Sequence, residues 1–464
     1  MKSMVTDYLD EVLEDVRPGD RGAPASYIPE LANVDPERFG VSLATIDGKV
    51  YGSGDTESEF TIQSIAKPFV YALALEDRGF RDVLKRVSVE PSGEAFNEVS
   101  LDEEGRPLNP MINAGALTTH SLVGGDDWTQ GQRLQRIIDG LSAFAGRRLQ
   151  VDERVCGSEL DHAHRNLSIA HMLRSYDIFP QDPRVIVEGY TRSCSLLVST
   201  RDLAIMAATL ANKGINPITG EKVVSGRVVR QVLSVMTTCG MYDAAGDWVT
   251  QVGIPAKSGV AGGLIGALPG QIGVATFSPR LDEHGNSVRG VRLFERMSRD
   301  MGIHLMEVPP SVQTVIRNTM VLVQDLTDDE KAQGVKPQKI KVYSIQGSLR
   351  FAGAEKIVRE FSSTTIKEPA VALDLTDVHA LDGVARRMIL EVARRLTLDG
   401  KRVYLIDPAD VIPKPDPGDG GQVIVVQDRA ELRAHQPEKR KKGKKDKNAK
   451  TRKKGTKGKK KDDT

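Results

Sequence analysis

The sequence predicts an α/β (α+β) protein with two folded domains and a disordered tail. Its 464 residues exceed the usual size of one domain, and a hydrophobic content of 39% is typical of globular chains with full cores. Residues 1–324 carry strand patterns near both ends and helical patterns between them. After a polar linker at 325–338, a strand–helix–strand pattern restarts and continues through 339–436.

The first domain opens with a hairpin signal. Residues 41–55 alternate around an Asp-Gly pair, which is typical of a two-residue turn. Helical patterns follow at 64–78, 129–146 and 200–214. The Gly- and Val-rich stretch 254–280 indicates neighbouring strands joined by tight turns, and a last helix ends at Gly302. We therefore expect a sheet in which strands from the two ends of the domain pair, with a helical subdomain inserted.

The second domain and the tail differ sharply in composition. Residues 371–378 and 401–407 indicate buried strands on either side of an amphipathic helix at 381–400, which predicts a small α/β domain. From Glu438 to the end there are 15 basic and 4 acidic residues, a balance of +11, so the remainder carries −10. We expect residues 437–464 to be disordered. Such a tail either solubilises the chain or contacts nucleic acid or anionic lipid electrostatically.

Cysteine usage and hydropathy predict a cytoplasmic protein. The three cysteines lie far apart without a Cys-x-x-Cys pair, and no apolar run is long enough for a membrane span or a signal core. His162, His164 and His171 form a cluster without a carboxylate-rich partner pattern, and the first two point to different helix faces. We therefore expect no metal site at these histidines.

Ser64 and Lys67 in "FTIQSIAKPFVYAL" form the chain's single Ser-x-x-Lys pattern. Residues i and i+3 share a helix face, so both side chains can aim at one point. A serine hydroxyl needs an adjacent base, and a lysine acts as one when burial lowers its pKa. The apolar neighbours suit that interpretation, and the alternative is a helix-capping serine beside a solvated lysine.

A second element lies about 190 residues later. Lys257, Ser258 and Gly259 fall on a predicted strand. In serine β-lactamases and penicillin-binding proteins, Ser-x-x-Lys is completed by a Lys-[Thr/Ser]-Gly strand that lines the same cleft. The order and predicted secondary structure of the two elements therefore indicate a serine hydrolase with a β-lactamase-like sheet flanked by helices.

Longer segments specify the family. Between the two elements the chain carries "NPMINAGAL", "YTRSCSLLVSTRDLA" and "GMYDAAGDW", and residues 1 to about 308 closely resemble the serine-dependent glutaminases. The resemblance implies hydrolysis of L-glutamine to L-glutamate and ammonia without a cofactor, in a homodimer or homotetramer. It implies that Ser64 forms a γ-glutamyl ester, with Lys67 as general base.

The resemblance also assigns the other site residues. Tyr27 and Tyr242 would lie beside the catalytic pair, and the backbone N–H groups of Ser64 and Val260 would form an oxyanion hole. The substrate's charged and polar groups would be bound by Glu159, which suits the ammonium, and by Asn113, Asn166, Tyr190 and Tyr242. Five of these residues also have an ordinary structural alternative. Asn113 would be a turn residue, and Glu159 and Asn166 would cap a helix. Tyr190 and Tyr242 would be core aromatics with a satisfied hydroxyl.

Residues 339–436 resemble a STAS domain, the fold of anti-sigma-factor antagonists. Phosphorylated members carry a serine after an Asp, whereas this chain has Gly383 after Asp382. The resemblance therefore implies docking of a protein or sensing of a ligand, without a phosphorylation switch at this point. Two functional alternatives stay open: a β-lactamase or peptidase of the same fold, and a STAS-type partner-switch protein with a vestigial enzyme domain.

Overall fold

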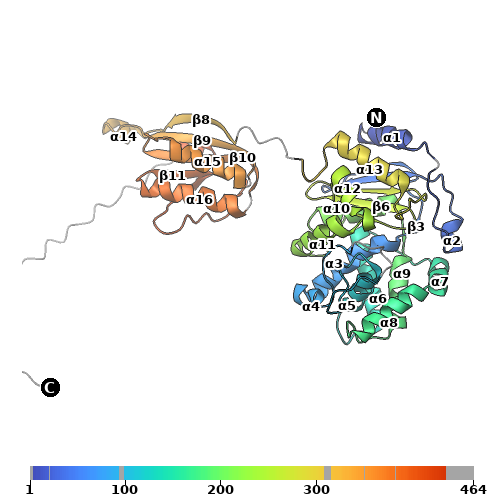
Figure 1. The fold of residues 1–464 in the computed structure, drawn as a ribbon. Coiled ribbons are helices and arrows are strands. Elements are labelled where there is room, and N and C mark those ends of the chain that lie inside the picture. The colour runs from blue at the N-terminus through green and yellow to red at the C-terminus, as the bar shows by residue number, and fades with distance from the viewer. Residues whose placement is uncertain are drawn as a thin grey trace, which may run out of the picture. The chain divides into compact units, whose positions relative to one another are not determined.

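The computed structural model describes residues 4–19, 21–92, 99–307, 315–349, 351–381 and 383–434 (Figure 1). The chain divides into two compact units, residues 1–308 and 309–464. Within the described residues, no helix is long and apolar enough to cross a membrane. The predicted disordered tail at 437–464 lies outside the described residues.

Unit 1 is built on a five-stranded antiparallel sheet with the strand order β2-β1-β7-β6-β5. Its strands are β1 (Gly40–Thr45), β2 (Val50–Gly54), β5 (Ala256–Ser258), β6 (Gly263–Leu268) and β7 (Ile272–Phe277). β1 pairs with β7 from Gly40↔Phe277 to Thr45↔Ile272. The predicted pairing of strands from the two ends of the domain is confirmed.

Helices cover both faces of this sheet. On one face, α1 (Met4–Val16) and α13 (Val288–Met301) lie side by side (Figure 1) and their apolar residues join those of β1, β6 and β7 in one core cluster. On the other face lies α10 (Thr200–Ala211), nearly all of it buried. Gly273 permits this approach, because a Cβ there would meet the backbone nitrogen of Ala208 at 2.1 Å.

The inserted helical subdomain surrounds α3 (Ala66–Arg78), whose residues from Ala66 to Leu75 are all buried. This helix contacts α5, α6 and α11. The other elements of unit 1 are α2 (Pro29–Ala32), β3 (Phe60–Thr61), η1 (Gln63–Ile65), α4 (Phe80–Leu84), α5 (Asn113–Leu122), α6 (Gln130–Ala145), α7 (Glu153–Asp161), α8 (His164–Ser175), α9 (Pro183–Cys194), β4 (Leu197–Val198), α11 (Gly226–Cys239), η2 (Tyr242–Ala244) and α12 (Ala245–Gln251).

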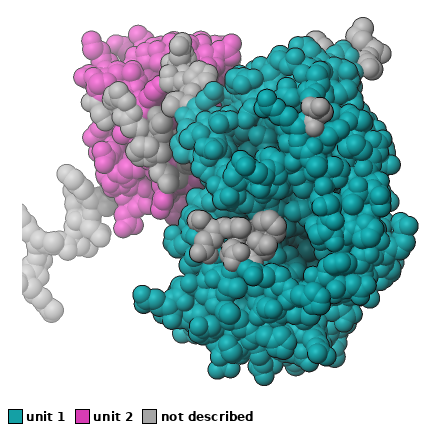
Figure 2. Space-filling view, turned by 45° about the vertical axis from the view of Figure 1, so that its right-hand side comes forward, with its two compact units in different colours: residues 1–308 teal, residues 309–464 magenta. Residues whose placement is uncertain are grey.

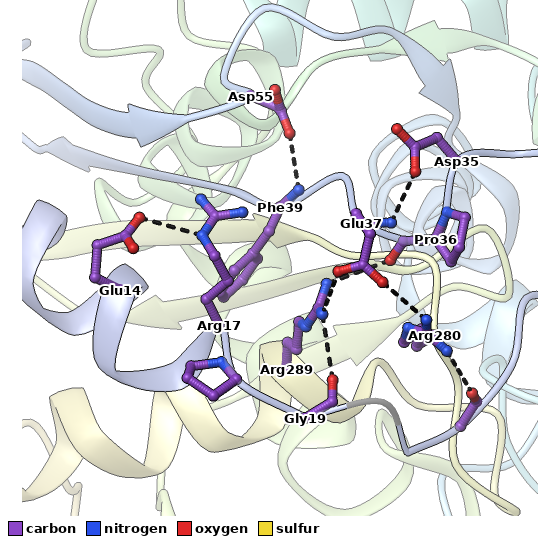
Figure 3. A network of polar contacts seen from close by, with 12 residues as sticks. Glu14, Arg17, Gly19, Asp35, Pro36, Glu37, Phe39, Asp55, Arg280 and Arg289 are labelled. Carbon is purple, nitrogen blue, oxygen red and sulfur yellow. Dashed lines mark hydrogen bonds and ion pairs between the residues drawn. The ribbon is translucent and has the colours of Figure 1, made fainter.

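A polar network fastens the N-terminal segment to α13 and to the connection between β7 and α13 (Figure 3). Glu37 accepts hydrogen bonds from both Arg280 and Arg289, each at 2.8 Å. Arg289 is buried and also donates to the carbonyl oxygens of Gly19 and Pro36. Its guanidinium lies 6.0 Å from the centre of the Phe39 ring, within cation–π range. One side chain of α13 therefore anchors three points of the segment that leads into β1.

We expect Arg289→Ala to destabilise unit 1 by about 2 kcal/mol. It removes charge-assisted hydrogen bonds to two backbone carbonyls, while the exposed Glu37 carboxylate stays solvated and adds no buried charge. Both tryptophans of the chain, Trp128 and Trp248, lie in unit 1, so urea unfolding followed by tryptophan fluorescence reports on this unit. The control is Arg154→Ala, at an exposed side chain, with an effect below about 0.5 kcal/mol. Equal midpoints for the two variants would contradict the anchoring role.

Unit 2 contains a five-stranded sheet with the order β12-β11-β10-β9-β8, of which β8 to β11 are labelled in Figure 1. Its strands are β8 (Ile316–Val323), β9 (Lys339–Leu349), β10 (Ala370–Leu381), β11 (Arg402–Ile406) and β12 (Ile424–Val426). Its helices are α14 (Asp328–Ala332), α15 (Phe351–Ser363), α16 (Gly383–Leu398) and α17 (Arg429–Ala434). Adjacent strands from β9 to β12 run parallel, while β8 is antiparallel to β9. The predicted strand–helix–strand pattern is present.

The predicted boundary between the domains differs from the observed one. The sequence interpretation ended the first domain at residue 324 and placed a linker at 325–338, whereas the chain divides after residue 308. The physical reason is β8, which pairs with β9 from Asn318↔Ser344 to Val323↔Lys339 and so belongs to the second sheet. The expected linker is the connection between these two strands and contains α14, which starts with a Thr327–Glu330 capping box.

Candidate active site

Ser64 and Lys67 lie where η1 passes into α3. The two side chains are only 7% and 1% exposed. The preceding Gln63 has a φ of +50°, an uncommon conformation for a residue with a side chain. β5 and β6 contact η1, and Gly263 permits this contact because a Cβ there would lie 2.9 Å from the Ile65 side chain. The end of the sheet therefore lies directly against the turn that carries Ser64.

Lys67 is held by the N-terminal end of α5. Its Nζ donates to Asn113 Oδ1 at 2.6 Å and to the Met111 carbonyl at 3.2 Å. Burial lowers the pKa of Lys67 to about 8, because the ammonium loses its hydration and gains no carboxylate among these partners. The side chain is thus a buried amine that releases its proton more easily than an ordinary lysine. The alternative of a solvated Lys67 is excluded.

Tyr242 connects Ser64 to β5. Its hydroxyl donates to the Ser258 carbonyl at 3.0 Å, and Ser64 is close enough to the phenol to lower its pKa. Tyr242 has a φ of +56°, and such a conformation in a bulky residue costs about 1–3 kcal/mol unless its surroundings impose it. Burial raises the pKa of Tyr242, so the phenol stays protonated at neutral pH. Two strained residues, Gln63 and Tyr242, therefore flank the Ser64 hydroxyl.

Glu159 on α7 receives two donors from distant parts of the chain. The Tyr27 hydroxyl donates to its Oε1 at 2.7 Å, and Gln63 Nε2 donates to the same oxygen at 3.1 Å. Desolvation raises the pKa of Glu159, while these donors oppose the shift. Tyr27 is 45% exposed as a residue, but desolvation of its hydroxyl and the nearby carboxylate raise its pKa. The Glu159 carboxylate thus contacts Gln63, the residue that directly precedes Ser64 in the chain.

Asn113, Asn166 and Tyr190 form a linked set of polar residues beside Lys67. Asn113 begins α5, and its Nδ2 donates to Asn166 Oδ1 on α8 at 3.0 Å. The Tyr190 hydroxyl lies 3.5 Å from Asn113 Oδ1, at the limit for a hydrogen bond. Burial and the nearby Cys194 on the same helix, α9, raise the pKa of Tyr190. Asn113 is therefore shared between the amine and the surrounding polar side chains.

Val260 lies in a tight turn after β5. Gly259 N–H donates to the Gly263 carbonyl and Gly262 N–H to the Gly259 carbonyl, which fixes the backbone on both sides of Val260. Gly285 approaches from a neighbouring loop, where a Cβ would lie 3.9 Å from Val260 Cγ1 and 4.0 Å from the Tyr242 ring. The turn is therefore held close to Tyr242.

The structure brings the predicted residues into one region. Hydrogen bonds connect Tyr27 and Gln63 to Glu159, Tyr242 to Ser258, and Lys67 to Asn113, which is linked in turn to Asn166 and Tyr190. Ser64 follows Gln63 in the chain and lies near Tyr242. The sequence interpretation missed Gln63 and Cys194. Gln63 adjoins the nucleophile candidate, so its position was a usable signal, whereas nothing in the sequence separates Cys194 from an ordinary buried thiol.

A cavity of about 420 Å³ lies beside Tyr242, and its lining includes Met111, Ile112, Thr238 and Cys239. The space-filling view shows that the surface of unit 1 is hollowed (Figure 2). Among the described residues, no group of three or more His, Cys, Asp or Glu is arranged to hold a metal ion. The side chains present can supply a nucleophilic hydroxyl, a buried amine, phenols and a carboxylate, which are the functional groups that an acyl-transfer site requires.

Comparisons with known proteins agree on a family. Residues 22–306 match the glutaminase family model, and residues 331–413 match the STAS domain model. The chain is 48% identical over 409 residues to a glutaminase of Corynebacterium glutamicum, covering 88% of this chain and 95% of that protein. It is 45% identical over 429 residues to a glutaminase of Corynebacterium efficiens, covering 92% and 98%.

Solved structures give the same result. A crystal structure of Mglu has a TM-score of 0.79 and 46% identity, covering 89% of this chain and all of that one. Mglu in its glutamate form matches with a TM-score of 0.79 and 42% identity over the same shares. A probable glutaminase from Bacillus subtilis, complexed with 6-diazo-5-oxo-L-norleucine, matches with a TM-score of 0.60 and 32% identity, covering 66% of this chain and 98% of that one.

Proposed function

This chain belongs to the glutaminase family, with a C-terminal STAS domain, and we propose that it hydrolyses L-glutamine through an ester on Ser64 with Lys67 as general base. The observation that supports the mechanism is the buried Ser64, which lies near Tyr242 and three residues from a lysine whose pKa is lowered to about 8. A serine hydroxyl beside a desolvated amine is the arrangement that nucleophilic catalysis requires.

The reaction proceeds in two steps. Lys67 takes the hydroxyl proton as Ser64 Oγ attacks the side-chain amide carbon of glutamine; the C–N bond then breaks and ammonia leaves with this proton, which Lys67 gives back either directly or by relay through the Tyr242 phenol. Water attacks the resulting γ-glutamyl ester as Lys67 again accepts a proton; Lys67 then returns this proton to Ser64 Oγ as the ester bond breaks, and glutamate departs. The backbone N–H groups of Ser64, which opens a helical segment, and of Val260 stabilise the oxyanion in both steps.

Substrate recognition uses the polar residues around this pair. Glu159 binds the α-ammonium, while Asn113, Asn166, Tyr190 and Tyr242 bind the remaining polar groups. The glutamate form of the related Mglu supports a site shaped for a free amino acid. Asn113 also accepts a hydrogen bond from Lys67, so the same side chain contacts both the substrate and the general base.

The mechanism is tested by trapping. Hydroxylamine attacks a γ-glutamyl ester to give γ-glutamyl hydroxamate and free Ser64, so we expect hydroxamate to form at the expense of glutamate. Turnover of glutamine in the presence of hydroxylamine without formation of γ-glutamyl hydroxamate would contradict the ester intermediate.

A second experiment separates a glutaminase from the alternative β-lactamase. It measures ammonia release from glutamine, asparagine and simple amides, and hydrolysis of a chromogenic β-lactam.

We expect Glu159→Gln to raise KM for glutamine about 10- to 100-fold while kcat falls less than about 10-fold. A carboxylate paired with the substrate ammonium stabilises bound substrate, and the isosteric amide removes the charge but keeps the acceptor for Tyr27 and Gln63. Steady-state kinetics across glutamine concentration measure the effect, and Glu153→Gln on the exposed end of the same helix is the control. A fall in kcat at constant KM would contradict the assignment to the ammonium.

Other parts of the interpretation stay proposals. We propose that the STAS domain docks a protein partner and that the enzyme is a homodimer or homotetramer. The three cysteines are free and buried, which supports a reducing, cytoplasmic environment. Contact of the basic tail with nucleic acid or anionic lipid concerns residues outside those the structure describes.

A further inference from the structure

The loop of residues 282–286, between β7 and α13, is a tightly bonded turn. The Asp282 carboxylate accepts the backbone N–H groups of His284 and Asn286, each at 2.9 Å. The backbone closes the same turn, because Asp282 N–H donates to the Asn286 carbonyl at 2.9 Å and Gly285 N–H donates to the Asp282 carbonyl at 3.1 Å. The loop is therefore ordered by its own hydrogen bonds.

Two consecutive residues of this loop meet two consecutive residues of η2. His284 Nδ1 and Asp243 Oδ2 are 3.0 Å apart and form an ion pair when the imidazole is protonated. The next loop residue, Gly285, approaches Tyr242, because a Cβ on it would lie 4.0 Å from the tyrosine ring. The same Cβ would lie 3.9 Å from Val260 Cγ1. The loop therefore lies next to the phenol beside the nucleophile and to the turn that supplies an oxyanion donor.

The backbone of η2 requires support from its surroundings. Tyr242 has a φ of +56°, a conformation that a bulky residue keeps only where neighbouring groups impose it. Its hydroxyl is held on the inside by the Ser258 carbonyl at 3.0 Å. The pair between His284 and Asp243 acts on the residue that directly follows Tyr242. It therefore opposes a shift of the η2 backbone and of the ring that this backbone carries.

The charged groups around His284 favour its protonated form. The hydrogen bond to Asp243 raises the pKa of His284, and desolvation opposes this shift. The negative charges of Asp243 on η2, and of Asp282 and Glu283 on the loop itself, raise the pKa further. A histidine with a raised pKa is mostly charged below its ordinary value of about 6.5 and loses its charge as the pH rises through the raised value. The ion pair is therefore strongest in mildly acidic solution and weaker above neutral pH.

We propose that His284 is a positioning residue for the reaction at Ser64. Its ion pair with Asp243 fixes η2 and the 282–286 loop against each other, and so holds the Tyr242 phenol and the Val260 turn in place. The proposal rests on the function proposed above and assigns His284 no contact with substrate. The two side chains of the pair are 39% and 44% exposed, so the pair adjusts the rate and is not essential for it.

The test measures glutamine hydrolysis by His284→Ala, Asp243→Asn and the double variant of the full-length enzyme. At pH 6 we expect His284→Ala to lower kcat about 2- to 5-fold with KM changed less than about 2-fold, because neither partner binds substrate. The double variant should be about as slow as His284→Ala alone, since the two residues act as one pair. The ratio of wild-type to His284→Ala kcat should decrease toward one at pH 9, and the titration of Lys67 cancels in this ratio because both enzymes share it.

The control is His171→Ala, at an exposed histidine of α8, with unchanged kcat at both pH values. Wild-type kcat in His284→Ala at pH 6 would overturn the proposal. Additive losses in the double variant, or an equal loss at pH 6 and pH 9, would overturn it too, because the imidazole would then act by packing and not through the pair. Asp243→Asn is isosteric and should show the same pH-dependent loss, so the result does not depend on one variant. Failure of the Ser64 mechanism is seen separately, as turnover by the wild-type enzyme with hydroxylamine present and no γ-glutamyl hydroxamate formed.

Discussion

Replacement of Ser64 by alanine should reduce kcat for glutamine hydrolysis about 10⁴-fold or more, to the limit of an ammonia-release assay. The substitution removes the only atom that forms the ester, and removal of a nucleophile leaves just the contributions of binding and the oxyanion hole. The side chain is small and lies at a helix start, so the fold should persist. Glutamate binding measured by calorimetry should stay within about 10-fold of wild type.

Ser234→Ala is the matched control for this experiment. Ser234 lies on the exposed face of α11, and its hydroxyl donates to the Arg230 carbonyl within that helix. We expect wild-type kinetics there. Hydrolysis by the Ser64→Ala enzyme at more than about 1% of the wild-type rate would show that another group, or water directly, attacks the amide.

Local chemistry explains which parts of the fold the sequence could predict. The β1–β2 hairpin follows from alternating residues around a turn glycine, Gly48, with a φ of +87°, and α6 ends where Gly146 adopts the left-handed conformation. Ser64 and Lys67 are separated by less than one helical turn. In each case the signal and the structure it specifies lie within a few residues, so no tertiary contact is needed to interpret it.

Distant contacts explain what the sequence could not predict. The positive φ values of Gln63 and Tyr242 are imposed by tertiary packing, not by residue type, and Tyr27 reaches Glu159 across 132 residues. The boundary error has the same origin. β8 follows a domain and precedes a polar stretch, and only its pairing with β9 shows which sheet it joins. The resemblance to a family supplied the distant residues as a set, because periodicity alone contains no such information.

Replacement of Lys67 by methionine should lower kcat/KM about 10³-fold. Methionine fills the buried site but cannot accept the Ser64 proton, and a positioned general base contributes about 10²- to 10⁴-fold. Lys67→Arg makes the informative comparison, because arginine keeps the positive charge and the donor for Asn113 but stays protonated. If Lys67 acts as a base, both variants should be inactive to a similar degree. Retention of more than about a tenth of the activity by Lys67→Arg would mean that the charge of Lys67, and not its basicity, serves the reaction.

The pH profile of the wild-type enzyme tests the same role independently. The neutral amine is the active form, so the rate should rise with pH and level off above the pKa of Lys67, about 8. Burial makes this feasible near neutrality: at pH 7 about one amine in ten is neutral with a pKa of 8, against about one in three thousand at the ordinary value of 10.5. Substrate that displaces water from the site should desolvate Lys67 further and move the midpoint of kcat to lower pH than that of kcat/KM. A profile that is flat from pH 6 to 9, or that falls through this range, would contradict a lysine base, because no protonated amine can accept the Ser64 proton.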